Sequence, residues 1–528
     1  MLGFNAPSYA GARLEMHSAN LYALLRSRYP DDPNAVFLES ESGAPLLCYG
    51  DLDRLVARMG SRLRRLGVGV GDRVLVQAPK SADAVCLYLA CLRSGAVFVP
   101  LNTAYTPDEV VGFLEDARPA LLVCAPEGAE ALREPVRAAG AELQTLGSQG
   151  EGTLIKDLEN EPETPMVPRE SSDMAAILYT SGTTGRSKGA VLSHGNLASN
   201  ALALHALWRF VPGDVLLHAL PIFHAHGLFV ALHCALLNGS RVIFLPRFDA
   251  SRVTALLGHA TVFMGVPTFY TRLLALPAFG ASGCEEVRLF VSGSAPLRAA
   301  THREFEARTG HRILERYGMT EAGMITSNPY DGERRPGTVG FALPDVEVRV
   351  ADADGRPLEP GRSGSLEIRG PNVFERYWGQ PEKTAQEFRP DGFFVTGDLA
   401  EMDEEGRVTL VGRTRDLVIS GGYNVHPAEV EACIDQLPGV RESAVIGVPH
   451  PDLGEGVTAV VVTEPGEALG EETIRAGLAG RLAGFKQPKR IFFVDALPRN
   501  AMGKVQKNAL RERFARTYTS AEDGQGMR

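Results

Sequence analysis

Short apolar runs alternate with amphipathic helical stretches along most of this chain. DRVLVQA (72–78), AVFVPL (96–101) and RVIFLP (241–246) are typical of buried strands, and YGDLDRLVARMGSRLRRLG (49–67) has helical spacing of its apolar residues. Strands separated by helices build largely parallel sheets that are covered by helices. The sequence therefore predicts an α/β fold.

The pattern changes near Val346, which indicates more than one structural unit. EVRVAD (347–352) and GSLEIRG (364–370) alternate with period two, as strands of small antiparallel sheets do. After Gly412 a new series of strands and helices begins, and 528 residues exceed one ordinary core. We expect an N-terminal domain over residues 1–412 and a C-terminal α+β domain over 413–528.

Charge and composition narrow the classes of partner. A net charge of −10 argues against a general nucleic-acid or anionic-membrane surface, and no apolar run reaches the 18 residues of a membrane span. The seven scattered cysteines are typical of reduced thiols. We expect a cytoplasmic monomer or homodimer, with an organelle matrix as an alternative because of Arg13, Arg26 and Arg28.

The stretch YTSGTTGRSKGA (179–190) combines glycines, hydroxyl groups and cations, which together favour a polyanion such as phosphate. It lacks the spacing of a Walker loop, because Lys188 is followed by Gly189 rather than by Ser or Thr. A surface turn with no ligand is the alternative, since such residues also favour turns.

Several further stretches occur in an order that resembles the adenylate-forming acyl-CoA synthetases. They are SGSAPL (292–297), YGMTE (317–321), TGDLA (396–400), GRTRDLVISGGYNVHPAEVE (412–431) and PRNAMGKVQK (498–507). This resemblance implies a large multi-sheet N-terminal domain and a small mobile C-terminal domain that rotates. It also implies the use of ATP, Mg²⁺ and coenzyme A, with an acyl-AMP formed first and a thioester second.

The resemblance assigns roles to residues that match the family's motifs. Expected contacts to the β- and γ-phosphates are Thr180, Ser181, Gly182, Thr183, Thr184, Gly185 and Lys188. Thr320 and Glu321 would contact the α-phosphate, and Glu321 would ligate Mg²⁺, a hard cation that prefers oxygen. The adenine slot would comprise Gly293, Ser294, Ala295, Pro296 and Tyr317, and the ribose would bind Asp398 beside Arg413.

Other matched residues belong to the predicted C-terminal domain. Lys504 corresponds to the family's catalytic lysine, which neutralises charge between the carboxylate and the α-phosphate. Arg415 occupies the hinge position, and Ser420, Gly421 and Gly422 correspond to the loop that admits coenzyme A. Taken alone, Lys504 would be interpreted as a solvated charge and Tyr317 as core packing.

The acyl substrate is the least constrained part of the prediction. His224, His226, Met264 and Ser292 belong to stretches expected at the acyl pocket, and Arg288 begins the run that leads into SGSAPL. Within the superfamily the chain most resembles the malonyl-CoA synthetases, which implies that Arg288 binds the distal carboxylate of malonate or methylmalonate. A surface ion pair of Arg288 with Glu285 or Glu286 is the alternative.

Other functions remain open at this stage. The same nucleotide motifs would serve a stand-alone adenylation enzyme that loads a carrier protein, or a ligase for another short, medium or long carboxylic acid. A non-catalytic nucleotide sensor is disfavoured by Lys504.

Overall fold

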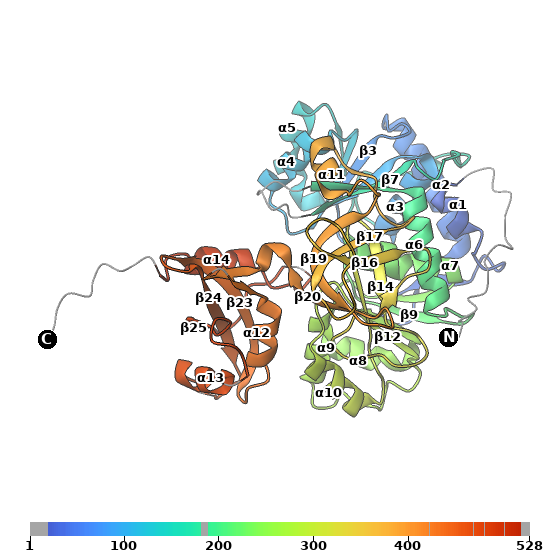
Figure 1. Ribbon diagram of the computed structural model, residues 1–528. Coiled ribbons are helices and arrows are strands. Elements are labelled where there is room, and N and C mark those ends of the chain that lie inside the picture. Colours follow the sequence, from blue (N-terminus) through green and yellow to red (C-terminus); the bar gives the residue numbers. More distant parts are fainter. Residues whose placement is uncertain are drawn as a thin grey trace.

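Two large sheets with helices packed on them form the main body, and a smaller body lies beside it (Figure 1). The computed structural model describes residues 19–180, 188–421, 423–467, 469–479, 481–500 and 502–518. None of the helices within these ranges is long and apolar enough to cross a membrane. All seven cysteines are free thiols, as expected.

The nine-stranded sheet carries the longest series of parallel strands. In spatial order its strands are β15 (Phe341–Ala342), β14 (Gly323–Ser327), β13 (Leu314–Met319), β12 (Leu289–Ser292), β11 (Val262–Gly265), β9 (Val215–His218), β10 (Arg241–Phe244), β1 (Val36–Glu39) and β2 (Pro45–Cys48). The strands from β13 to β1 pair in parallel, and the strands at both edges are antiparallel.

The seven-stranded sheet carries the phosphate-loop stretch. Its strands are β18 (Arg376–Tyr377), β8 (Lys188–Ser193), β7 (Met174–Thr180), β4 (Val97–Pro100), β3 (Arg73–Gln77), β5 (Leu121–Cys124) and β6 (Glu142–Thr145). Strands β7 and β8 form an antiparallel pair in which Thr180 faces Lys188. The residues between them, 181–187, lie outside the described residues.

Strand alternation sorts side chains into two cores. In β3, Val74 and Val76 join the main core, whereas Leu75 between them joins a second core on the other face. The second core is covered by α4 (Pro107–Ala117) and α5 (Ala129–Ala138). The main core includes residues of α1 (Leu21–Arg26), α2 (Tyr49–Arg65), α3 (Ala82–Ser94), α6 (His194–Leu207) and α7 (His233–Asn238).

Three further helices, α8 (Ala250–Leu256), α9 (Pro267–Leu274) and α10 (Ala299–Thr309), lie together at one end of the main body (Figure 1). Helix α9 follows β11 directly, and its first turn begins at Pro267, where proline suits a helix start. The predicted helix–strand alternation therefore holds across this body.

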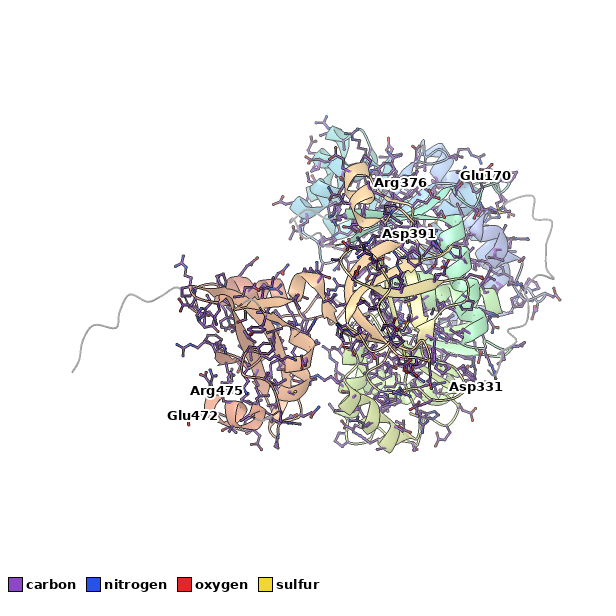
Figure 2. All side chains as sticks on the ribbon, in the orientation of Figure 1. Glu170, Asp331, Arg376, Asp391, Glu472 and Arg475 are labelled. Carbon is purple, nitrogen blue, oxygen red and sulfur yellow. The ribbon has the colours of Figure 1, made fainter. Side chains whose placement is uncertain are left out.

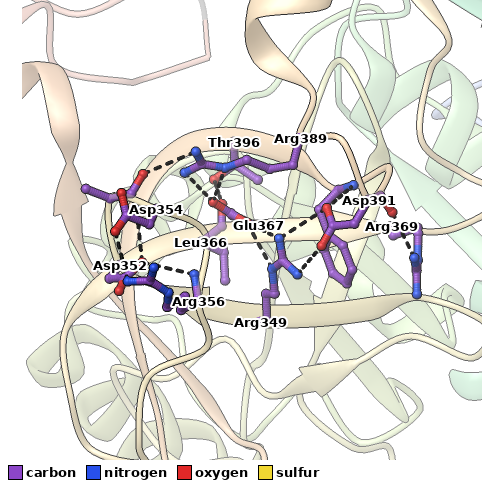
Figure 3. A network of polar contacts seen from close by, with 12 residues as sticks. Arg349, Asp352, Asp354, Arg356, Leu366, Glu367, Arg369, Arg389, Asp391 and Thr396 are labelled. Carbon is purple, nitrogen blue, oxygen red and sulfur yellow. Dashed lines mark hydrogen bonds and ion pairs between the residues drawn. The ribbon is translucent and has the colours of Figure 1, made fainter.

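A four-stranded antiparallel sheet follows, as the alternating pattern after Val346 predicted. Its strands are β16 (Glu347–Ala351), β17 (Gly364–Arg369), β19 (Phe394–Met402) and β20 (Val408–Arg413). The fully buried carboxylate of Glu367 binds Arg349 at 2.7 Å and Arg389 at 2.7 Å (Figure 3). A buried charge is stable only when paired, so this network fixes β17 against β16 and against the segment around Arg389 that leads into β19, the strand that carries Asp398.

The small body has a five-stranded sheet with a separate core on each face. It comprises β22 (Tyr423–Val425), β21 (Val418–Ser420), β24 (Gly454–Thr463), β23 (Val440–His450) and β25 (Arg490–Phe493). Helices α12 (Pro427–Ile434) and α13 (Glu471–Leu478) cover one face, and α14 (Lys507–Phe514) covers the other. Glu472 and Arg475 of α13 lie on the outer side of this body, away from the large one (Figure 2).

The stretch LVISGGYNV (417–425) does not form one continuous strand. LVISGGYNV forms β21 and β22, which pair with each other in antiparallel orientation. The break occurs because Gly421 has φ of 59°, a left-handed conformation that a continuous strand cannot contain.

Candidate active site

The parallel strands of the nine-stranded sheet deliver several predicted residues to one edge. Strand β11 ends at Gly265, and β12 ends at Ser292, directly before the Gly293–Leu297 stretch. Ligands of open α/β sheets bind outside the carboxyl ends of such strands. Met264 and Ser292 are buried here, at adjoining strand ends.

The expected nucleotide residues converge around Asp398. This carboxylate is 4% exposed, accepts a 2.5 Å hydrogen bond from the Tyr317 hydroxyl, and lies 3.0 Å from the Arg413 Nε. Strands β13, β19 and β20 bring these three residues together from distant parts of the sequence. The structure thus assembles an acid, an aromatic ring and a cation, which is the set expected for a nucleoside.

A loop of the small body reaches the same place and carries Lys504. Met502 is buried in the core of the large body, and a Cβ on Gly503 would lie 2.7 Å from Thr268 Oγ1 at the start of α9. Burial and the nearby Arg413 lower the pKa of Lys504 to about 8, which Asp398 partly opposes. A bound anion would offset both effects, so this ammonium is suited to an anionic substrate.

Buried between β12 and β14, Arg316 is the most unusual group at this edge. Arg316 is 2% exposed. Among the described residues, its Nε and one terminal nitrogen of the guanidinium have no hydrogen-bond partner. A methyl group on Gly293 would come within 2.4 Å of Arg316 Cζ, which places the guanidinium against the start of the Gly293–Leu297 stretch. Burial lowers the pKa of Arg316 to about 9, so it is still a cation at neutral pH.

Other polar groups near Arg316 also lack partners within the described ranges. They are Ser292 Oγ and His226 Nε2, both buried. His226 Nδ1 lies 3.3 Å from Ser294 Oγ, which joins the first residue of the π-helix η3 (His226–Leu232) to the Gly293–Leu297 stretch. Unpaired buried polar groups are rare, so a cluster of them at the carboxyl end of a sheet is a candidate ligand-binding site.

His224 lies between this cluster and the loop that carries Lys504 in electrostatic terms. Burial, then Arg316, then Lys504 lower its pKa to about 4, so it is a neutral imidazole at neutral pH. The ring therefore lies within electrostatic reach of both cations. Asp398 likewise acts electrostatically on Lys504, so charge interactions link these four groups.

The structure does not bring Arg288 to this site. It precedes Leu289 at the amino end of β12, whereas the site lies at the carboxyl end, about 13 Å away at 3.3 Å per residue. Its Nε donates to Asp214 at 2.8 Å, and its guanidinium lies over the rings of Phe210 and Tyr330. The assignment of Arg288 to the distal carboxylate is therefore wrong, because Asp214, not substrate, neutralises this cation. The alternative of an ion pair holds, but the partner is Asp214 rather than Glu285 or Glu286.

Glu321 lies in the short connection between β13 and β14, not at a helix start. It is buried, and its Oε1 lies 3.0 Å from the Tyr377 hydroxyl. Burial raises the pKa of Glu321, and hydrogen bonds from its own backbone and from Tyr377 oppose this. Thr320 lines a small cavity with Asn196, Asn200 and Asn372 beside it.

The phosphate-loop residues are only partly described. Thr180 ends β7 and Lys188 begins β8, while Ser181, Gly182, Thr183, Thr184 and Gly185 lie outside the described residues. The Lys188 ammonium lies 2.9 Å from Glu387 Oε1 and 5.0 Å from the centre of the Tyr377 ring. Burial alone would raise the pKa of Glu387, but hydrogen bonds from Lys188, Tyr377 and Lys383 hold it below its usual value.

The predicted coenzyme A residues lie in the hairpin of the small body. Ser420 is buried at the end of β21, the Gly421 amide donates to the Leu453 carbonyl at 2.8 Å, and Gly422 lies outside the described residues. Arg415 lies in the single turn η5 (Thr414–Asp416), directly after β20, the last strand of the four-stranded sheet. Beyond this turn the chain enters the small body.

Arg316, Tyr377 and Glu387 were missed by the sequence interpretation. A signal for Arg316 existed, because an adjacent Glu–Arg pair interrupts the apolar start of a buried strand in ILERYGM. Strand alternation directs the two side chains to opposite faces, and Glu315 instead accepts a hydrogen bond from the Leu297 amide at 2.9 Å. Nothing local marks the roles of Tyr377 and Glu387, since the contact of Tyr377 with Glu321 spans 56 residues and that of Glu387 with Lys188 spans 199.

Comparison with known families agrees with this geometry. Residues 26–378 match the AMP-binding enzyme family, and residues 429–504 match the AMP-binding enzyme C-terminal domain. The chain therefore belongs to the AMP-binding enzyme family, which confirms the family expected from the motifs.

Individual relatives cover most of the chain. A feruloyl-CoA synthase of Amycolatopsis sp is 37% identical over 89% of this chain and 95% of its own. The mitochondrial malonate–CoA ligase of Mus musculus is 36% identical over 90% of this chain and 88% of its own.

A solved structure is more similar still. ATP-bound MatB from Rhodopseudomonas palustris is 53% identical, covers 95% of this chain and 100% of its own, and superposes with a TM-score of 0.93. The apo form of the same protein gives 0.81. These values confirm the expected fold class, and this structure matches the ATP-bound form more closely than the apo form.

Replacing Arg288 tests its corrected role. Arg288→Met should leave the Asp214 carboxylate, which is 1% exposed, without its cation, at a cost of about 3 kcal/mol. We expect a lower thermal unfolding midpoint and an unchanged KM for the acyl substrate of the folded enzyme.

The matched control is Arg209→Met, which removes an exposed ion pair with Asp331 near the same Tyr330 ring. It should scarcely change the unfolding midpoint. A raised KM in Arg288→Met with unchanged stability would return Arg288 to the acyl site.

Proposed function

We propose that this protein is a malonate–CoA ligase that forms malonyl-AMP and then malonyl-CoA, with release of pyrophosphate and AMP. Methylmalonate is the expected second substrate. The proposal draws on the similarity to malonate–CoA ligases and to MatB. The single observation that carries it is the buried, unpaired guanidinium of Arg316.

Arg316 selects a dicarboxylate for an electrostatic reason. A buried cation without an anion is strongly unfavourable, and no described carboxylate forms an ion pair with Arg316. The second carboxylate of malonate supplies that charge, while Ser292 and His226 offer further polar contacts. Met264 contributes apolar wall, and a methyl branch costs only about 1–3 kcal/mol where space is tight.

The remaining residues act on the nucleotide. Asp398 binds the ribose hydroxyls beside Arg413, and the adenine lies between Tyr317 and the Gly293–Pro296 backbone. The β- and γ-phosphates are held by Thr180, Ser181, Gly182, Thr183, Thr184, Gly185 and Lys188. Lys504 neutralises the charge that develops between the reacting carboxylate and the α-phosphate.

The buried carboxylate of Glu321 and the half-buried hydroxyl of Thr320 beside it fit Mg²⁺, a hard cation that retains waters and phosphate oxygens. Bound there, Mg²⁺ would supply positive charge to the phosphates. Glu321 would hold the ion, and Tyr377 would orient the Glu321 carboxylate through their contact.

The two half-reactions require movement of the small domain. We place the domain boundary between Gly412 and Arg413 and the hinge at Arg415, in the single turn that joins the two bodies. Rotation there removes Lys504 and brings Ser420, Gly421 and Gly422 to the site, where the glycines admit the pantetheine arm of coenzyme A.

Feruloyl-CoA synthase relatives point to an aromatic acid as the alternative substrate. A neutral aromatic group would bury Arg316 without an anion, so this alternative is less favourable. A carrier protein could replace coenzyme A as the thiol. We propose that the protein acts in a reducing compartment, with the cytoplasm preferred to an organelle matrix. We also propose that it is a monomer or a homodimer.

The first test is pyrophosphate release with a panel of acids, each with and without coenzyme A. Malonate should give the highest kcat/KM, followed by methylmalonate, with succinate, acetate, octanoate and ferulate lower. Turnover with malonate should depend on free coenzyme A. Preference for ferulate, or indifference to coenzyme A, would contradict the proposal.

Arg316→Met tests the acyl assignment, because methionine keeps an apolar stem and removes the charge. The kcat/KM for malonate should fall by about two to four decades, equivalent to 3–5 kcal/mol for one unpaired buried charge. The kcat/KM for butyrate should hold or rise.

Arg316→Lys is the conservative control and should recover part of the malonate activity, since it restores the charge without the planar fork. If malonate and butyrate activities fall in parallel in Arg316→Met, Arg316 supports the fold rather than the substrate.

Lys504→Ala separates the half-reactions. Adenylation should slow by about 10²-fold, the scale of one lost transition-state charge contact, whereas thioester formation from supplied malonyl-AMP should be largely spared. Lys507→Ala is the control, because Lys507 pairs with Glu431 at 2.7 Å inside the small body. Equal loss of both half-reactions in Lys504→Ala would argue against domain rotation.

A further inference from the structure

Glu387, the last residue of α11 (Pro381–Glu387), contacts three side chains. Two come from the strands β8 and β18, and the third lies one turn earlier in the same helix. The Glu387 Oε1 lies 2.9 Å from Lys188 Nζ and 3.0 Å from Lys383 Nζ, and its Oε2 lies 2.7 Å from the Tyr377 hydroxyl. Tyr377 lies on β18, which pairs with β8 immediately after Lys188. The network therefore lies at the exit of the phosphate-loop stretch.

Lys188 has little solvent around it. Its side chain is 11% exposed, and the ammonium faces the Tyr377 ring. Within the described residues, Glu387 is the carboxylate that forms an ion pair with it. A cation so shielded requires an anion close by, whether from the protein or from a ligand.

We propose that Glu387 is a substitute anion, one that neutralises Lys188 while the phosphate site is empty and is displaced from it when the terminal phosphates of ATP bind. This inference rests on the proposed role of Lys188 as a phosphate ligand. It adds a residue that sets the affinity for triphosphate without itself touching the nucleotide.

The local contacts explain how the exchange occurs. Lys383 lies within the same helix and keeps Glu387 neutralised after Lys188 turns to phosphate. Tyr377 retains its contact to Glu387 and also lies 3.0 Å from Glu321. Phosphates carry more charge than one carboxylate, so Lys188 favours them once they are present.

Glu387→Gln removes the charge while it keeps the shape and an acceptor for Tyr377. Freed from competition, Lys188 should bind β,γ-methylene-ATP about two- to fivefold more tightly, the scale of one ion pair with a carboxylate that keeps some contact with solvent. Affinity for AMP, which lacks the terminal phosphates, should be unchanged. Equilibrium binding by calorimetry measures both without turnover.

Matched variants separate this inference from the proposed function. Glu382→Gln makes the same change at an exposed position of the same helix and should alter neither affinity. Lys188→Met should weaken binding of the ATP analogue. Adding Glu387→Gln to that variant should not tighten binding, since the partner of Glu387 is gone.

Each contrary result has a distinct meaning. If Lys188→Met weakens binding of the analogue but Glu387→Gln leaves the affinity unchanged or lower, Glu387 is not a substitute anion and the phosphate role of Lys188 stands. If Lys188→Met does not weaken the analogue, the proposed phosphate role fails and the inference fails with it.

Discussion

A cation buried without its anion governs this site. Arg316 is held by β13 between buried neighbours, and its guanidinium lies against Gly293, the residue that follows the carboxyl end of β12. Folding such a group is unfavourable, so other interactions of the large body must offset its cost until a ligand arrives. The same unpaired cation that lowers the stability of the folded protein also favours binding of an acid with two carboxylates over an acid with one.

Two other cations of the site are treated differently. Lys188 is matched by Glu387, and Arg413 by Asp398, each at about hydrogen-bond distance. Each pair is neutral overall, so neither cation is a buried charge without a partner. In the proposed function, charge in the nucleotide region is balanced by the protein, whereas charge in the acyl region is completed by substrate. This difference would separate general nucleotide affinity from acid selectivity.

Motifs in sequence order were enough to predict the family, both bodies and the convergence of Tyr317, Asp398 and Arg413. They failed for Arg288 because a strand has two ends, and a run such as VRLFVSGSAPL does not say which end a charge must reach. Asp214, the true partner, precedes Arg288 by 74 residues. Contacts between residues so far apart in sequence depend on the order of the strands in the sheet, and a local sequence pattern does not reveal that order.

The account depends most on whether Arg316 awaits a second carboxylate. The direct measurement is kcat/KM for malonate against its monomethyl ester, which keeps one free carboxylate for adenylation and masks the other with little change in shape. We predict a preference for malonate of at least about 100-fold, because the ester leaves a buried guanidinium unpaired. Equal kcat/KM values for the two acids would contradict the account.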